Sequence, residues 1–139
     1  MPNPFPFTSG QVLTAAQMYG IGEAAIDYTP VVTAGAGTIT SYTAFGGYQI
    51  VNKIMRVWFN INITNNGTAT SFIRFTLPTA QVLKTYGQVV GGCRESSVNG
   101  FFNQCWTETT TTIAITSPTN TYPAGTGFQL NGTVLVQIP

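Results

Sequence analysis

The chain has 139 residues, 6% of them charged, and a formal net charge of +1. This length suits one domain, and the near-zero charge gives no electrostatic basis for binding nucleic acid or an anionic membrane. The chain contains no histidine, which excludes Ser-His-Asp triads, most zinc sites and the commonest general base. The carboxylates at Glu23, Asp27, Glu95 and Glu108 do not suggest a pair across a cleft, so we predict a protein that is not an enzyme and holds no cofactor or metal.

Residues 1–22 are predicted to form an N-terminal arm with a short helical segment. Three prolines and two phenylalanines among residues 1–9 favour an extended chain over a packed element. This arm is either a disordered terminus or an anchor that lays Phe5 and Phe7 on another surface. Residues 14–19 are a helix candidate, because Thr14 can cap the N-terminus and Gln17 follows three residues later.

Residues 23–139 are predicted to form the folded domain, which begins with weakly patterned segments. We expect an extended segment over residues 24–30, a loop of small residues over 31–37 and a weakly alternating strand over 37–44. The sequence Phe45-Gly46-Gly47 is predicted to turn the chain into the next strand.

The stretch from residue 48 to 78 has the clearest pattern in the chain. Apolar residues alternate with polar ones from Val51 to Ile63, which is the period of a half-buried strand. Asn65-Asn66-Gly67 then provides a turn, and the alternation resumes until Leu77. The pattern predicts one unusually long hairpin.

Ile54 and Trp58 interrupt the polar outward face of this hairpin, which also carries Arg56 and Arg74. The two arginines, which we place on adjacent strands, are either solvated charges or partners for acidic groups of another subunit. Trp58 favours a contact surface, because aromatic residues are enriched at interfaces. The candidate partner-binding residues are therefore Phe5, Phe7, Met18, Arg56, Trp58 and Arg74.

The second half of the domain is predicted to add further strands. Val89 and Val90 begin one strand, and residues 93–97 and 101–107 form a hairpin around Asn99-Gly100. A Thr-rich strand over 109–116, a loop over 117–127 and an alternating strand over 128–138 complete the chain. Seven or eight strands at this spacing predict an all-β fold, a single jelly-roll-like β-sandwich.

Cys93 and Cys105 flank the Asn99-Gly100 turn, and their relation depends on the length of the loop. A two-residue turn places Cys93 opposite Trp106, with the thiols on opposite faces. A three-residue loop places Cys93 opposite Cys105, and we expect this register, with positive φ at Gly100 and adjacent sulfurs. The sequence leaves both redox states of this cysteine pair as alternatives. The lack of an export signal favours reduced thiols, whereas release of a particle from the host into oxidising surroundings favours a disulfide.

Two sets of residues carry a resemblance to a known group of proteins. The segment Phe7-Thr-Ser-Gly-Gln-Val-Leu-Thr-Ala-Ala-Gln-Met18 is similar to the opening of many phage structural proteins, and Gly37-Thr38, Gly47-Tyr48, Gly67-Thr68 and Leu77-Pro78 follow it in order. The chain thus resembles the small β-sandwich modules of tailed-bacteriophage virion proteins. Such modules resemble trimeric jelly rolls of the tumour-necrosis-factor-like kind, so the resemblance implies a homotrimer. The chain has no coiled-coil or collagen-like shaft, which favours a compact unit on the capsid or tail.

Two functions agree with these features. The favoured one is a capsid-decoration, or cement, protein that binds the major capsid protein or another virion protein. The alternative is a tail-fibre or appendage-tip protein that binds a host receptor or glycan, through Tyr122 with Asn120 or through Phe101-Phe102-Asn103. The first residues lack a signal-peptide pattern and no apolar run reaches about 18 residues, so we expect synthesis in a host cytoplasm and a location in the virion.

Overall fold

The computed structural model describes residues 10, 12, 14, 15, 24–78, 82–85 and 87–139. Within these residues the protein is all-β, as predicted, and has nine strands. The arm with Phe5 and Phe7, most of the predicted helix and Met18 lie outside the described residues. The strands are β1 (Ile26–Tyr28), β2 (Val32–Ala36), β3 (Ser41–Val51), β4 (Ile54–Asn65), β5 (Thr70–Thr76), β6 (Val89–Glu95), β7 (Phe102–Thr107), β8 (Thr112–Thr116) and β9 (Gln129–Gln137).

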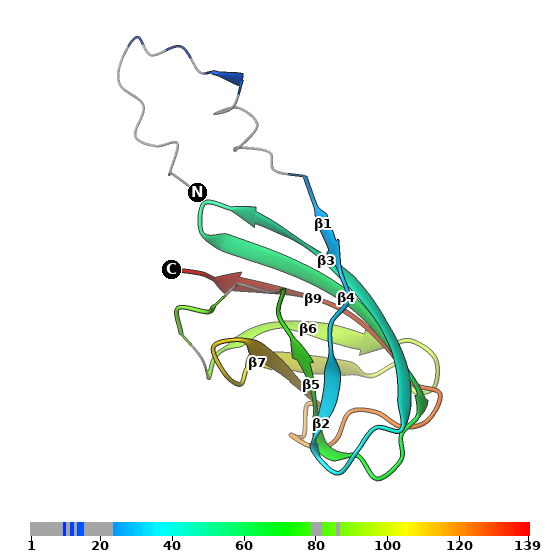
Figure 1. Cartoon of the computed structure of the whole chain (residues 1–139). Helices are drawn as coiled ribbons and strands as arrows, with labels where there is room; N and C mark the ends of the chain where they lie inside the picture. The colour runs from blue at the N-terminus through cyan, green and yellow to red at the C-terminus, as the bar shows by residue number, and fades with distance from the viewer. Residues whose placement is uncertain (1–9, 11, 13, 16–23, 79–81, 86) are drawn as a thin grey trace.

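All nine strands belong to one antiparallel sheet in the order β1-β3-β4-β9-β6-β7-β8-β5-β2. The sheet curls so that its two halves face each other, which gives a sandwich-like fold (Figure 1). The rings of Phe59 on β4 and Phe75 on β5 have centroids 4.5 Å apart, although four strands separate β4 from β5 in the sheet order. The curled sheet therefore encloses a single core between its halves.

The core follows the period-2 pattern read from the sequence. On β4 the odd residues from Met55 to Ile63 are at most 3% exposed, and the even residues point outward. Ile73, Phe75 and Leu77 are buried in the same way, whereas Arg74 and Thr76 are only half-buried. Apolar side chains on one face of a strand are removed from water together, which is the dominant favourable term in folding.

The partners of these two strands differ from the prediction. β4 pairs with β3 and β9, and β5 pairs with β2 and β8, so the predicted long hairpin between them does not form. Arg56 and Arg74 are accordingly not on adjacent strands. β4 instead forms its hairpin with β3, through a turn at Asn52 and Lys53 whose φ angles are 48° and 66°. Two consecutive positive φ angles match a type I′ turn, whose twist suits a two-residue hairpin.

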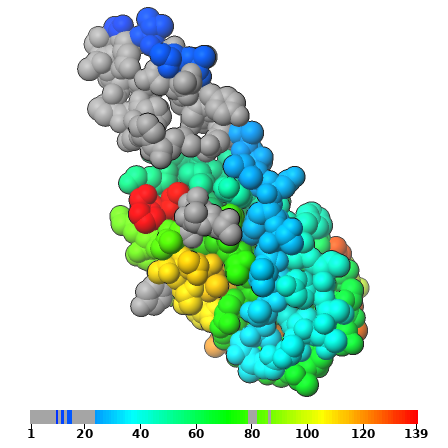
Figure 2. Space-filling view, in the orientation of Figure 1, coloured from blue at the N-terminus to red at the C-terminus, as the bar shows by residue number. Residues whose placement is uncertain are grey.

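Two segments expected to be irregular are strands. Residues 32–36 form β2 at the edge of the sheet beside β5, and the two lie together in the space-filling view (Figure 2). Gly46 and Gly47 lie inside β3 and do not form a turn. Gly47 on β3 is paired with Trp58 on the neighbouring strand β4, and the Trp58 ring lies over the glycine. A Cβ at Gly47 would lie 2.2 Å from that ring. The glycine is therefore needed for this close approach.

The cysteines are adjacent, but in neither predicted register. Cys93 pairs with Asn103 and Cys105 pairs with Gly91, so the two cysteines are diagonal neighbours on the core face. Both are free thiols and are at most 1% exposed. A hydrogen bond with Cys93, together with burial, raises the pKa of the Cys105 thiol well above its usual value. The predicted positive φ at Gly100 is confirmed, at 71°.

Candidate binding surface

The loop between β6 and β7 is longer than either predicted turn. Arg94 is the last β6 residue that pairs with β7, opposite Phe102, and the Glu95 N–H donates to the carbonyl of Phe101 at 2.8 Å. This leaves residues 96–100 outside the ladder, and we call them the tip loop. A loop of this length has several backbone N–H groups without a strand partner, and each needs an acceptor.

The Glu95 carboxylate is that acceptor. Its Oε2 accepts the N–H groups of Val98, Asn99 and Gly100 at 2.8, 2.7 and 3.3 Å. Its Oε1 accepts the N–H groups of Ser97 at 2.8 Å and of Gln129 on β9 at 3.1 Å. The side chain has no solvent exposure, because the loop wraps around it. One buried carboxylate thus fixes the path of the tip loop and ties it to β9.

These hydrogen bonds also determine the ionisation state of Glu95. Burial by itself would raise its pKa, but the backbone N–H groups of Asn99, Ser97, Val98 and Gln129 stabilise the anion and lower the pKa to about 2. The carboxylate is therefore ionised at neutral pH. Charge-assisted hydrogen bonds of this kind are about twice as strong as neutral ones.

The tip loop presents apolar side chains to solvent. Val98 is 60% exposed, and Phe101 and Phe102, which directly follow the loop, are 63% and 65% exposed. The Asn99 side-chain oxygen accepts the Phe101 N–H at 2.9 Å, which fixes the exit of the loop. Large apolar residues on a rigid support are typical of interaction sites, since little conformational freedom is lost on binding.

A second feature crosses the outer face of the sheet next to this loop. Five outward-facing residues on five neighbouring strands are each paired with the next and so form one line across the sheet. We call this line the outer row, and it consists of Phe45 on β3, Asn60 on β4, Asn131 on β9, Arg94 on β6 and Phe102 on β7. Phe45 is 64% exposed, much like Phe102 at the other end. Four inter-strand steps of about 4.8 Å separate these rings by roughly 19 Å.

The centre of the outer row is polar and internally hydrogen-bonded. Asn60 donates to the side-chain oxygen of Asn131, and Asn131 donates to the Ser96 hydroxyl at 2.7 Å. Arg94 is the charged member of the row and is exposed. The outer row therefore offers two aromatic contacts on either side of amide groups and a guanidinium, which is the composition of a protein interface.

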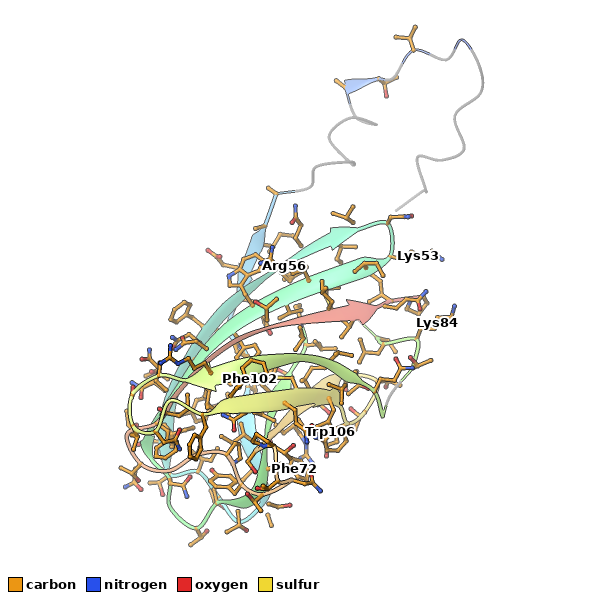
Figure 3. All side chains as sticks on the ribbon, turned by 180° about the vertical axis from the view of Figure 1, so that it is seen from behind. Lys53, Arg56, Phe72, Lys84, Phe102 and Trp106 are labelled. Atoms are coloured by element: carbon orange, nitrogen blue, oxygen red, sulfur yellow. The ribbon has the colours of Figure 1, made fainter. Side chains whose placement is uncertain are left out.

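Trp58, by contrast, is only half-buried and its ring covers Gly47, so packing within the chain accounts for this aromatic residue. Arg56 is exposed on β4, opposite Gln49 and Leu135. On the other half of the sheet, Phe72 and Trp106 form an edge-to-face pair with ring centroids 5.9 Å apart (Figure 3). These half-buried aromatic residues pack on their own sheet.

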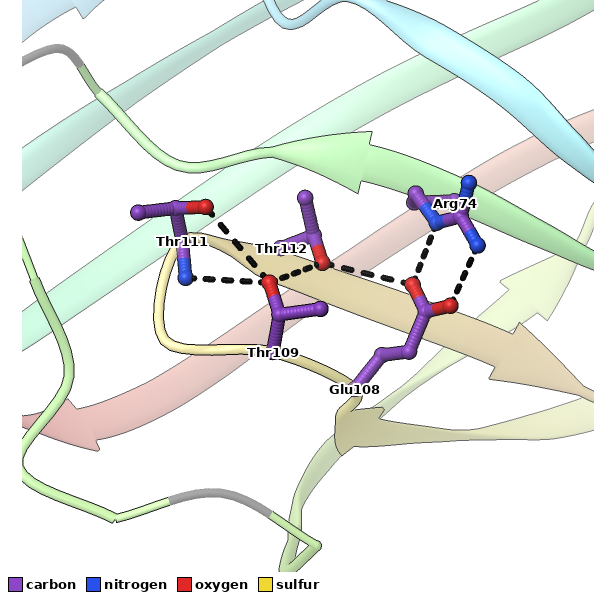
Figure 4. Close-up of polar contacts among 5 residues, drawn as sticks. All are labelled: Arg74, Glu108, Thr109, Thr111 and Thr112. Carbon is purple, nitrogen blue, oxygen red and sulfur yellow. Dashed lines mark hydrogen bonds and ion pairs between the residues drawn. The ribbon is translucent and has the colours of Figure 1, made fainter.

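Arg74 also has its partner within the chain. Its guanidinium makes a bidentate ion pair with Glu108, which also accepts a hydrogen bond from Thr112 at 3.2 Å (Figure 4). The guanidinium carbon lies 5.4 Å from the centre of the Phe72 ring. The guanidinium of Arg74 is thus bonded to a carboxylate along its edge and lies over an aromatic ring, and both partners belong to the same chain.

No protein-family model, curated protein or solved structure matches this chain. Its chemistry is therefore judged from the described residues alone. Among them, no group of three His, Cys, Asp or Glu side chains could hold a metal ion. In the same part of the chain, no helix is long and apolar enough to cross a membrane.

Each of the two candidate glycan sites has one residue that is already buried or hydrogen-bonded within the chain. Asn103 is 1% exposed, on the core face of β7. The Tyr122 hydroxyl donates to the side-chain oxygen of Asn66 at 2.5 Å, and burial raises the pKa of Tyr122 to about 12. Phe101 and Phe102 are exposed as a glycan site would need, but Asn103, their expected polar neighbour, is buried.

Sequence reasoning missed Glu95 and Phe45 as site residues. Glu95 was considered only as a catalytic carboxylate, although its position just before Ser-Ser-Val-Asn-Gly is a signal that a side chain could cap the loop. Phe45 was placed in a turn, so its outward direction in β3 was not foreseen. The outer row itself depends on strand pairings that the sequence does not reveal.

Proposed function

We propose that this protein is a non-enzymatic structural protein of a tailed-phage virion, a capsid-decoration protein that binds the outer shell as a trimer. The observation that carries the proposal is the outer row, in which Phe45 and Phe102 lie exposed on either side of hydrogen-bonded amides. A preorganised surface with two exposed rings and one cation, Arg94, suits a protein partner. Because the sequence resembles phage virion modules, we propose that this partner is the major capsid protein.

The energetics agree with a binding role for the two rings. Each phenylalanine is about two-thirds exposed, so a partner can still remove most of its surface from water. Burying such a side chain contributes about 1.5–3 kcal/mol. Two rings would then account for roughly a 100-fold or greater change in affinity. The appendage alternative has less support, because Asn103 is buried and the Tyr122 hydroxyl is already bonded.

The test uses shells that lack their decoration. Wild-type protein labelled at the exposed Pro139 is mixed with purified, expanded capsids and analysed by co-sedimentation and imaging. We expect label over the whole shell, and binding weakened by about 100-fold in the double variant Phe45→Ser/Phe102→Ser. Val31→Ser, at a residue 56% exposed outside the outer row, is the matched control and should bind normally. Label at a single vertex, or full binding by the double variant, would contradict the proposal.

A further inference from the structure

A groove lies at the opposite end of β6 from the tip loop. The ladder between β6 and β9 ends at the pair Gly91 and Val134, while β9 continues to Gln137 beside β4. The space beside the end of β9 has a volume of about 340 Å³. We call it the aliphatic groove, and it is lined by Ile54, Gln88, Val89, Val90, Thr107, Leu135, Val136 and Gln137.

The lining of the groove is largely apolar and open to solvent. Ile54, Val89 and Leu135 are 45%, 68% and 56% exposed. Exposed apolar residues that lie together mark interaction sites more often than singly scattered ones do. Small-molecule sites enclose most of their ligand, which a groove with such exposed walls does not do. A protein segment, which brings its own surface to cover the groove from outside, is the better fit.

Three cations lie at the rim of the aliphatic groove. Arg56 is paired with Leu135 in the ladder between β4 and β9, so the two side chains leave the same face of the sheet. Lys53 directly precedes β4, and the Lys84 N–H donates to the carbonyl of Gln137 at 3.0 Å. Lys53 and Lys84 lie at the same end of the sheet (Figure 3). All three cationic residues are exposed.

The carboxylates of the described residues do not neutralise this rim. The one ion pair found among those residues joins Arg74 to Glu108, and the Glu95 carboxylate is surrounded by the N–H groups of the tip loop. Asp27, the other carboxylate side chain in this part of the chain, is on β1, and β3 lies between it and β4. Three of the five Lys and Arg residues of the chain therefore gather around the aliphatic groove.

A matching occupant carries aliphatic groups and negative charges together. Its aliphatic side chains remove Ile54, Val89 and Leu135 from water, and its carboxylates face the rim cations. An arginine at the rim adds geometric selectivity, because a guanidinium can bind a carboxylate through two parallel hydrogen bonds. We propose that the aliphatic groove binds an acidic segment, rich in aliphatic residues, of a partner protein.

This site is separate from the outer row. Asn60 of the outer row and Arg56 at the groove are both on β4, and the strand between them spans roughly 13 Å. The inference does not rest on the proposed function, because it follows from the lining and the rim of the groove alone. Its test accordingly contains no capsid component.

A synthetic peptide is the probe for this site. The peptide is short and blocked at both ends, with glutamate alternating with leucine, and is titrated into ¹⁵N-labelled protein of the full chain in about 50 mM salt. We expect amide shifts at groove residues such as Val90 and Val136, none at the tip loop, and a dissociation constant of about 0.1–1 mM. The same peptide with glutamine in place of glutamate should bind about tenfold more weakly.

Two variants separate the charges from the apolar lining. The triple variant Lys53→Gln/Arg56→Gln/Lys84→Gln and the single variant Leu135→Ser should each weaken binding about tenfold. The triple variant should no longer distinguish the glutamate peptide from the glutamine peptide, whereas Leu135→Ser should still do so. Val31→Ser, at a similarly exposed residue that does not line the groove, is the control and should bind like wild type. Thermal melting checks that each variant is folded.

Several outcomes would overturn the inference. They are shifts at the tip loop in place of the groove, equal binding of the two peptides by wild-type protein, or no shift up to about 5 mM peptide. Vesicles of phosphatidylglycerol are a second probe, used in co-sedimentation. Vesicle binding that the triple variant loses would assign the groove to an anionic membrane surface and would likewise overturn the proposed protein partner.

Discussion

Replacing Glu95 by Gln tests whether the buried carboxylate holds the tip loop. Glutamine keeps the shape of the side chain but has a single acceptor oxygen. If that oxygen takes the place of Oε2, it retains the N–H groups of Val98, Asn99 and Gly100. The amide NH₂ then faces the N–H groups of Ser97 and Gln129, so two donors lose their acceptor.

The cost follows from those two donors and from the lost charge. A buried donor without a partner costs about 1–3 kcal/mol, and hydrogen bonds to a charged acceptor contribute more than neutral ones. We therefore expect Glu95→Gln to lower the free energy of unfolding by about 4 kcal/mol. For a domain with about 5–15 kcal/mol of total stability, this is a large change that still leaves a folded protein.

Urea unfolding followed by the fluorescence of Trp58 and Trp106 measures the change. With a urea dependence of about 2 kcal/mol per molar, the midpoint should move down by about 2 M. Glu108→Gln is the matched control, since it also removes a carboxylate that accepts hydrogen bonds, here from Arg74 and Thr112. A loss below about 1 kcal/mol in Glu95→Gln would refute the reasoning, because the loop N–H groups would then be satisfied without the carboxylate.

The same carboxylate predicts a pH dependence. Its pKa falls from a usual value of 4.5 to about 2 on folding, so its contribution is fully present above pH 4.5 and is lost as the pH falls towards 2. A shift of this size corresponds to roughly 3 to 4 kcal/mol, and because only one surface loop covers the carboxylate, partial screening by solvent reduces the expected loss to about 2 kcal/mol. The loss should be present in wild type and in Glu108→Gln but absent in Glu95→Gln. Equal pH profiles in all three proteins would contradict it.

Further predictions concern backbone strain, ring packing and the thiols. Ser71 has a φ of 76°, so Ser71→Gly should raise the free energy of unfolding by about 0.5 kcal/mol in urea titrations, and a loss would contradict the strain. Gly47→Ala should cost about 1–2 kcal/mol because the Trp58 ring must move, and unchanged stability would show that it moves freely. Cys93 and Cys105 should react with a thiol reagent only after unfolding. Diagonal Cβ atoms at about 7 Å are too far apart for a disulfide, so a disulfide in the purified protein would refute this register.

The sequence alone determined which residues of each strand face the core. Alternation from Met55 to Ile63 and from Ile73 to Leu77 predicted buried faces that the structure confirms. This works because the side-chain direction in a strand has a period of two residues, so burial appears in the local order of apolar and polar residues. Composition likewise indicated an all-β chain without histidine chemistry.

Only the tertiary structure decided which strands are neighbours. β4 pairs with β9, more than sixty residues further along the chain, and not with β5, which directly follows it. Backbone hydrogen bonds are alike for every pair of strands, so a local pattern does not select the partner, and the curling of the whole sheet does. The outer row and the ionised Glu95 beneath the tip loop both depend on that selection, because they join residues from strands that are far apart in the sequence.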